Sequence, residues 1–330
     1  MTPKENYLNF FRNKPYEWVP KNEDMQPVFA SVISENVARG MIMEGKPFPP
    51  ERFGGIGWFG IEWVFVPMVG GSMEKEGTQL FEDFNDWEKY VKFPDLDEVD
   101  WEGYAKEHYD YLHTDKLNMA SVFTGFFERM ISFAGFENAA LALVDEDQED
   151  AVHALLDKLA DFYIDYITRM NKYWNVQFFE VHDDWGNQRS LMFSLDTHKY
   201  MIMPHVKKVI DAVHALGCPY EQHSCGAITA LVPSMIEAGI DSWMGQTTAI
   251  DRKAIIDQYE PEFGHILKFR TQAMVKDNGT DEDILEAADK FVEDYSGKRV
   301  HYWLKAIGIS PERQKLFHDR VKRDFVLPKF

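Results

Sequence analysis

The stretch Val176–Val181 (VQFFEV) is short, apolar and rich in bulky side chains, and the polar turn His182–Gly186 (HDDWG) follows it directly. Its length and composition are typical of a strand. One amphipathic helical pattern precedes it, from about 149 to 170, and another follows, from about 197 to 216. Strands that alternate with helices of this length predict parallel βαβ units.

The alternation continues toward the C-terminal part of the chain. The pattern predicts strands at 219–223, 241–244 and 265–269, and helices at 126–134, 137–143, 227–238, 251–259 and 281–295. The sequence has no Gly-x-Gly-x-x-Gly and no Walker-type loop, which disfavours a nucleotide-binding doubly wound sheet. A chain of 330 residues is within the usual range for one large barrel. We therefore predict an α/β fold, a (β/α)8 TIM barrel, with residues 1–330 as a single domain.

The first 115 residues or so are irregular and rich in aromatic side chains. Thr2 and Glu5 form a capping box for a helix predicted at 3–13. Large aromatic residues then alternate with glycines, which suggests a close-packed loop or strand because linkers lack such apolar content. Three of these residues are candidates for the wall of a substrate pocket, and core packing is the alternative: Trp58, Phe59 and Trp63.

Composition excludes several classes of protein. The chain carries 55 acidic and 35 Lys or Arg residues, a formal net charge of −20, so DNA or RNA would be repelled. No stretch approaches the roughly 20 apolar residues that span a bilayer. The start of the chain, MTPKE, lacks the apolar region of a signal peptide. Two cysteines make no disulfide framework, and a reducing compartment is expected, so we predict a cytoplasmic protein without membrane partners.

The tetrad His223–Gly226 (HSCG) stands at the end of the strand predicted at 219–223. In an extended segment the side chains of residues i and i+2 point to the same face, so His223 and Cys225 could converge on one ion. A thiolate and a neutral imidazole are preferred zinc ligands. The alternative is chance proximity, since two ligands alone do not make a site.

Polar residues at the end of the strand 176–181 could complete such a site, because barrel active sites lie at the carboxyl ends of strands. Glu180 is still inside the apolar run and must be paired or ligated there. Asp183 and Asp184 could orient a substrate or donate a proton, and solvated loop acids are the alternative. His301 could be a further metal ligand on the last strand, or a structural histidine beside two aromatic residues.

The segments that carry this chemistry also carry a family resemblance. It extends over much of residues 50–245 and rests on these segments: Gly57–Trp63, Asp86–Glu88, Phe127–Arg129, Gly135–Asn138, Glu180–Gln188 with the helix up to Pro204, His223–Gly226 and Ile236–Asp241. In these segments the chain resembles the uroporphyrinogen decarboxylase superfamily. More specifically, it is similar to the branch of corrinoid- and zinc-dependent methyltransferases.

The resemblance implies a (β/α)8 barrel, zinc bound by His223 and Cys225, and methyl transfer through a corrinoid protein. In that branch the third protein ligand is commonly a late cysteine, and this chain has no cysteine after Cys225. Glu180, Glu221 and His301 remain as candidates for that ligand. The departure favours a reaction in which zinc polarises a donor oxygen over one that methylates a thiol.

The leading hypothesis from the sequence is an enzyme that demethylates a small methoxylated compound, expected to be aromatic, and passes the methyl group to the cobalt of a partner corrinoid protein. Three alternatives stay open: transfer from methylcobalamin to tetrahydrofolate or a thiol, a uroporphyrinogen decarboxylase-like lyase, and a non-catalytic ligand-binding barrel. The region 28–35 lacks the arginines that bind carboxylates in true uroporphyrinogen decarboxylases. The oligomeric state is also open, a homo-oligomer included.

Overall fold

The computed structural model describes residues 1–68 and 71–329. Its main element is a curled sheet of seven parallel strands in the order β1-β5-β6-β7-β8-β9-β10. The strands are β1 (Met25–Pro27), β5 (Leu117–Val122), β6 (Phe178–His182), β7 (Tyr220–Ser224), β8 (Ser242–Gly245), β9 (Lys268–Met274) and β10 (Val300–Lys305). The α/β class and the parallel order predicted from the sequence are confirmed. The described residues supply seven strands of the expected eight.

The two ends of the sheet meet at one point. Lys21, just before β1, forms a parallel bridge with Tyr302 of β10, and the Tyr302 N–H donates to the carbonyl oxygen of Pro20 at 3.1 Å. The long segment between β1 and β5 forms a separate antiparallel sheet of β2 (Gly55–Ile56), β3 (Glu62–Val66) and β4 (Gly71–Glu74). This segment was predicted to be irregular, a close-packed loop or strand, and the pairing of its three strands was not predicted.

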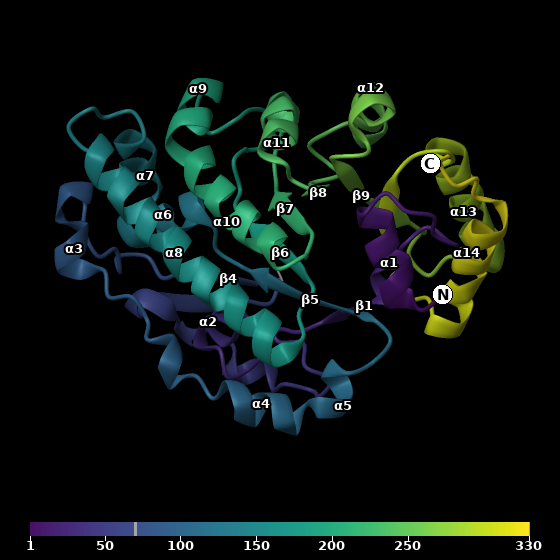
Figure 1. Ribbon diagram of the computed structural model, residues 1–330, viewed down its shortest axis with the longest axis horizontal. Coiled ribbons are helices and arrows are strands. Elements are labelled where there is room, and N and C mark those ends of the chain that lie inside the picture. Colours follow the sequence, from purple (N-terminus) through teal and green to yellow (C-terminus); the bar gives the residue numbers. More distant parts are fainter. Residues whose placement is uncertain (69–70, 330) are drawn as a thin grey trace.

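The helices, most of which cover the outside of the parallel sheet, are labelled in Figure 1. They are α1 (Pro3–Phe11), α2 (Ser34–Ala38), α3 (Trp87–Tyr90), α4 (Trp101–Glu107), α5 (Tyr109–Leu112), α6 (Phe126–Ala134), α7 (Phe136–Ala142), α8 (Glu149–Trp174), α9 (Leu195–Thr197), α10 (Met203–Ala215), α11 (Val232–Ala238), α12 (Arg252–Phe263), α13 (Asp281–Tyr295) and α14 (Pro311–Asp324). Helices α8 and α10 lie side by side, as do α13 and α14. None of the helices described is long and apolar enough to cross a membrane.

Helix α1 begins as the capping box predicts: Thr2 accepts from the Glu5 N–H, and Glu5 accepts from the Thr2 N–H. Its aromatic face packs inside the sheet, where Tyr7 and Phe11 contact Phe178 at the start of β6. Aromatic rings bury a large apolar area, which stabilises this arrangement. Because Phe178 begins β6, α1 closes the amino end of the curled sheet and leaves the carboxyl end for the loops.

Some strands begin and end at residues other than those predicted, because the turns next to them were not recognised in the sequence. Strand β9 begins at Lys268 and continues to Met274, whereas the pattern predicted 265–269. Residues 264–267 instead complete the end of α12, where Leu267 N–H donates to the Phe263 carbonyl. The helix predicted at 197–216 contains a π turn at His198–Ile202 before α10.

Candidate metal centre

The carboxyl ends of β6 and β7 bring three metal-ligand types together. The strands are parallel neighbours in a register that pairs His182 with His223. Cys225 Sγ lies 3.4 Å from His223 Nε2, and Asp184 Oδ1 lies 3.8 Å from the same nitrogen. Asp184 Oδ1 also accepts from the Cys225 N–H at 2.6 Å. The thiol, imidazole and carboxylate therefore converge, as the spacing of His223 and Cys225 predicts.

A glycine after Cys225 makes this turn possible. Gly226 has φ +89°, a conformation that residues with a Cβ rarely adopt. A Cβ there would lie 2.2 Å from the carbonyl carbon of Gly186, in the loop after β6. The close contact between the two loops holds Asp184 and Cys225 against each other.

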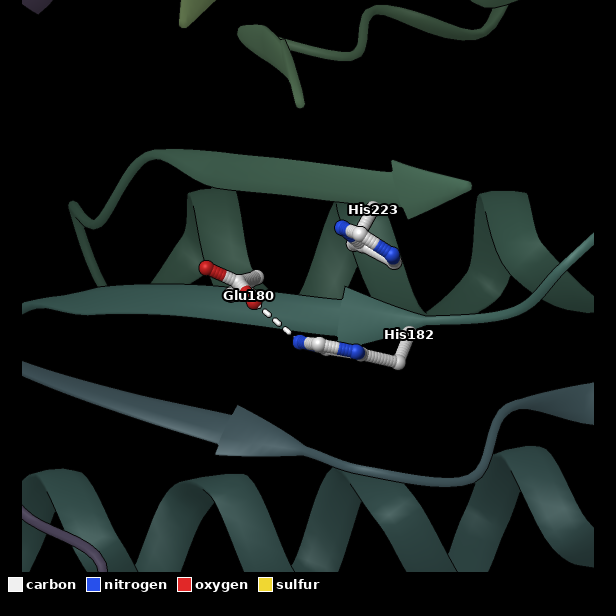
Figure 2. A group of neighbouring side chains, drawn as sticks. All are labelled: Glu180, His182 and His223. Carbon is white, nitrogen blue, oxygen red and sulfur yellow. Dashed lines mark hydrogen bonds and ion pairs between the residues drawn. The ribbon is translucent and has the colours of Figure 1, made fainter. Parts of the chain in front are cut away.

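A second group of potential ligands shares His223 with the first. Glu180, His182 and His223 place ligand atoms within 4.8 Å of one another (Figure 2). Glu180 Oε1 is hydrogen-bonded to His182 Nε2. The rings of His182 and His223 are stacked, with centroids 4.3 Å apart and planes inclined by 22°.

The first group fits a zinc ion by its donor chemistry. Burial, with the neighbouring His182, lowers the pKa of His223 to about 4, so its imidazole is neutral, the form that binds metals. Burial and the adjacent Asp184 raise the pKa of Cys225 to about 12. A thiolate at this position therefore requires a cation beside it, which a metal ion would supply. The side chain of Asp184 is 34% exposed and that of His223 is 15% exposed.

Asp183 is used in a different way. Its Oδ2 accepts from the N–H groups of Phe126 and Phe127 at 3.1 and 3.2 Å, and Oδ1 accepts from Glu128 N–H at 2.9 Å. It also accepts from Trp185 Nε1 at 2.9 Å. These donors form the first turn of α6, whose unsatisfied N–H groups favour a negative charge. Asp183 is 1% exposed, so it joins α6 to the end of β6 and does not face the three ligands.

Burial raises the pKa of Asp183 to about 6, although four N–H donors favour its charged form. The close approach of α6 depends on Gly125, because a Cβ there would lie 2.5 Å from Asp183 Cβ. The two aspartates predicted as catalytic residues are thus placed differently. Only Asp184 lies with His223 and Cys225.

Glu180 and His301, predicted as further metal ligands, have other partners. Glu180 is 3% exposed, and its Oε2 accepts from Arg270 Nη1 at 2.8 Å. Burial raises the pKa of Glu180, but His182 and Arg270 outweigh burial and leave the pKa lowered. His301 is bonded through Nδ1 to Tyr7 at 2.6 Å and through Nε2 to Ser242 at 2.7 Å. The structure therefore does not bring His301 to the metal-ligand groups.

The three aromatic residues predicted to wall a pocket are buried. Trp58 packs on α8, with ring centroids 5.0 Å from Phe162 and 4.8 Å from Tyr166. Phe59, at φ +60°, packs on α6 and α8, and Trp63 lies 4.3 Å beneath the Arg39 guanidinium. These contacts are those of core residues.

Two residues that were not predicted as site residues face the site. Glu128 is half-buried near the start of α6, and its Oε2 is buried without a hydrogen-bond partner in the described part of the chain. Burial raises the pKa of Glu128 to about 8; the charges of Asp184 and Asp183 add to this, and Arg39 opposes it. A carboxylate in the apolar run around Phe126–Ala134 was the available signal. Arg39 donates to the carbonyl of Phe123.

Comparison with known proteins follows from this geometry. Residues 74–313 match the family described as uroporphyrinogen decarboxylase (URO-D), which is nearly three quarters of the chain. The chain belongs to the URO-D family. Members of this family are enzymes, and both strand ends with their ligand residues lie inside the matched region. No curated protein matches the chain.

Solved structures give only distant similarities to this URO-D family chain. A GH36 α-galactosidase from Geobacillus stearothermophilus has 10% identity and a TM-score of 0.36, covering 68% of this chain and 33% of that one. The 3-keto-D-glucoside 4-epimerase of E. coli has 12% identity and a TM-score of 0.32, covering 72% and 83%. A sugar phosphate isomerase/epimerase from Parabacteroides distasonis has 9% identity and a TM-score of 0.31, covering 72% and 78%. At these scores the similarities say nothing about substrate.

Proposed function

We propose that this URO-D family protein is a zinc-dependent methyltransferase that demethylates a small methoxylated, aromatic compound and transfers the methyl group to the cobalt of a partner corrinoid protein. The observation that carries the proposal is the convergence of His223, Cys225 and Asp184 at the carboxyl ends of β6 and β7. In this proposal the curled sheet is a barrel of the (β/α)8 type, and the Lys21–Tyr302 bridge marks its seam.

The residues that would hold zinc are His223 through Nε2, Cys225 through Sγ and Asp184 through Oδ1. In this set the carboxylate of Asp184, next to β6, takes the place of the late cysteine. Glu180, Glu221 and His301 are not part of the set. A bound zinc would act as a Lewis acid toward the ether oxygen of the donor, whose alkoxide or phenolate is a poor leaving group. Three protein ligands leave the fourth position open, as in catalytic zinc sites.

The protein's own side chains supply the remaining chemistry. Glu128 would hold a proton at Oε2 near neutral pH and donate it to the oxygen that leaves, because burial keeps its pKa near 8. Asp183 fixes the first turn of α6 and so places Glu128 opposite Asp184. Trp58, Phe59 and Trp63 would support this arrangement from the core, one layer behind the substrate.

A decarboxylase is the second candidate, because the family is described by that activity. A polycarboxylate substrate needs cationic partners, and Arg39 is a cation within electrostatic range of Glu128 and His182. Zinc dependence separates the two candidates. The methyltransferase needs the zinc ligands, whereas a decarboxylase could bind carboxylates through Arg39 without them.

The test begins with metal content. Purified protein should contain about one zinc per chain, and Cys225→Ser, His223→Ala and Asp184→Asn should each lose most of it. Cys218→Ser and Asp183→Asn are the matched controls and should retain zinc in the folded fraction. Holo-protein should then methylate a Co(I) corrinoid protein from a panel of methoxyarenes. Wild-type protein without zinc, or zinc that survives Cys225→Ser, would refute the metal site.

A further inference from the structure

A continuous chain of buried polar contacts crosses the interior of the curled sheet, from α1 to the metal-ligand groups. It joins side chains from strands that are not neighbours, which the curl of the sheet brings face to face. Its members are 0–5% exposed. In order they are Tyr7 (α1), His301 (β10), Ser242 (β8), Glu221 (β7), Arg270 (β9) and Glu180 (β6), followed by the half-buried His182.

The hydrogen-bond directions at the amino end of this chain follow from its geometry. Ser242 donates its hydroxyl proton to Glu221 Oε2 at 2.6 Å. Ser242 Oγ therefore accepts from His301 Nε2, which leaves Nδ1 to accept from the Tyr7 hydroxyl. Burial lowers the pKa of His301, in agreement with a neutral ring. The ring of His301 is fixed at both nitrogens and cannot turn toward His223.

Arg270 is the branch point. Its Nη1 lies 2.8 Å from Glu180 Oε2 and 2.5 Å from Glu221 Oε1, and its Nη2 donates to Asn22 Oδ1 at 2.9 Å. One planar guanidinium thus holds two buried carboxylates and one amide in fixed directions. Without it, two like charges would face each other in a region of low dielectric constant.

Glu180 connects Arg270 to the metal-ligand groups. Its second oxygen accepts from His182 Nε2, and the ring of His182 lies on the ring of His223. A carboxylate behind an imidazole fixes the orientation of the ring. Glu180 can serve His182 in this way only while Arg270 holds the opposite oxygen.

The amino-terminal segment also contributes contacts to this buried chain of polar residues. Tyr7 and Asn22 lie outside residues 74–313, the region that matches the URO-D family. They are nevertheless direct partners of His301 and Arg270. The support of the site therefore includes a part of the chain to which the family match does not extend.

We propose that Arg270 is a positioning residue. Through Glu180 it holds the His182 ring on His223 and so presents His223 Nε2 to Cys225 and Asp184. Asn22, in the amino-terminal segment, fixes the guanidinium of Arg270. The effect of Arg270 on metal affinity rests on the proposed function. Its effect on His182 does not.

The variants are Arg270→Lys, Asn22→Ala, Glu180→Gln and the double variant Arg270→Lys/Glu180→Gln. Lysine keeps the charge but cannot span three acceptors, so Arg270→Lys should weaken zinc binding at least about tenfold in competition with a chelator. Asn22→Ala should weaken it less. The zinc affinity of the double variant should not fall below that of the single variant with the lower affinity, because Arg270 acts through Glu180. Arg299→Lys, in the ion pair with Glu260, is the control and should bind as wild type.

The readout that does not depend on metal is the nitrogen resonance of His182 in ¹⁵N-histidine-labelled apo-protein, assigned by its loss in His182→Gln. Asn22→Ala and Arg270→Lys should change both ring-nitrogen shifts, because the carboxylate that orients the ring is displaced, in protein whose circular dichroism is unchanged. Unchanged shifts in Asn22→Ala and in folded Arg270→Lys would overturn the proposal, as would additive losses of zinc affinity in the double variant. If Arg270→Lys does not fold, Asn22→Ala decides the matter. If wild-type protein binds no zinc, the proposed function fails and the His182 shifts alone decide this inference.

Discussion

The ring of His182 lies on the ring of His223, with centroids 4.3 Å apart, and the two residues are paired across the parallel register of β6 and β7. This pairing places the chemistry of two strand ends within one site. Burial, with the charge of the neighbouring His182, lowers the pKa of His223 and keeps its imidazole neutral. The predictions below separate the residues that serve this site from those that serve the core around it.

Asp183→Ala should destabilise the protein without removing its metal site. The substitution leaves three N–H groups of α6 and the Trp185 indole without an acceptor. Each buried unsatisfied donor costs about 1–3 kcal/mol, so we expect a loss of at least about 3 kcal/mol in the free energy of unfolding in urea. Asp196→Asn, at an exposed aspartate, is the control. Full stability with loss of zinc would show instead that Asp183 is a functional ligand.

His198→Phe should flatten the dependence of stability on pH below neutrality. His198 is fully buried between Trp185 and Phe193, and burial lowers its pKa from 6.5 to about 3. The unfolded chain therefore binds a proton below pH 6.5 that the folded chain excludes, and stability falls as pH decreases from 6.5 toward 3. At pH 5 this amounts to about 2 kcal/mol.

The measurement for His198 is urea unfolding at pH 7.5 and pH 5. The Phe variant should lose less stability between these values than wild type does. His113→Gln, at an exposed histidine, should behave as wild type. Equal losses in wild type and His198→Phe would mean that the buried ring is protonated without cost.

Glu128→Gln should stabilise the protein at alkaline pH and slow the proposed reaction. Burial raises the pKa of Glu128 from 4.5 to about 8, so the folded state keeps a proton that the unfolded state releases. Stability contributed by this group is therefore present below pH 4.5 and lost as pH rises to 8. After allowance for partial exposure, we expect Glu128→Gln to be about 1–2 kcal/mol more stable than wild type at pH 8.

Glu137→Gln, at an exposed position on the next helix, is the control for Glu128 and should change neither stability nor rate. Methyl transfer by Glu128→Gln should fall by about 10²-fold or more, as expected when a general acid is removed. A Glu128→Gln variant with wild-type turnover would exclude this carboxyl as the proton donor.

Trp58→Ala should cost about 3–5 kcal/mol in the free energy of unfolding, because it removes a buried ring from between Phe162 and Tyr166. Trp58→Phe retains most of the packing and should leave the KM for the methyl donor unchanged. A raised KM in Trp58→Phe at unaltered stability would restore Trp58 to the pocket wall that the sequence suggested.

Local sequence predicted much of the parallel sheet and of the helices that cover it. Helix α6 runs from Phe126 to Ala134, the predicted bounds, because its apolar residues recur at helical spacing. Strands β1 and β5 were not predicted, because β1 has only three residues and Leu117–Val122 has no distinctive alternation. The bounds and pairing of strands β2 to β4 were not predicted for a related reason: the glycine and proline residues near them are typical of irregular structure.

The sequence by itself determined the parallel α/β class and the convergence of His223 with Cys225, because periodicity and i, i+2 spacing are local properties of the backbone. Only the tertiary structure decided which carboxylate joins them. Asp183 and Asp184 are adjacent in sequence, yet one accepts from α6 and the other faces Cys225. Likewise, Glu180 and His301 become partners of buried residues more than 80 positions away. Such choices depend on how the sheet curls, which no local pattern encodes.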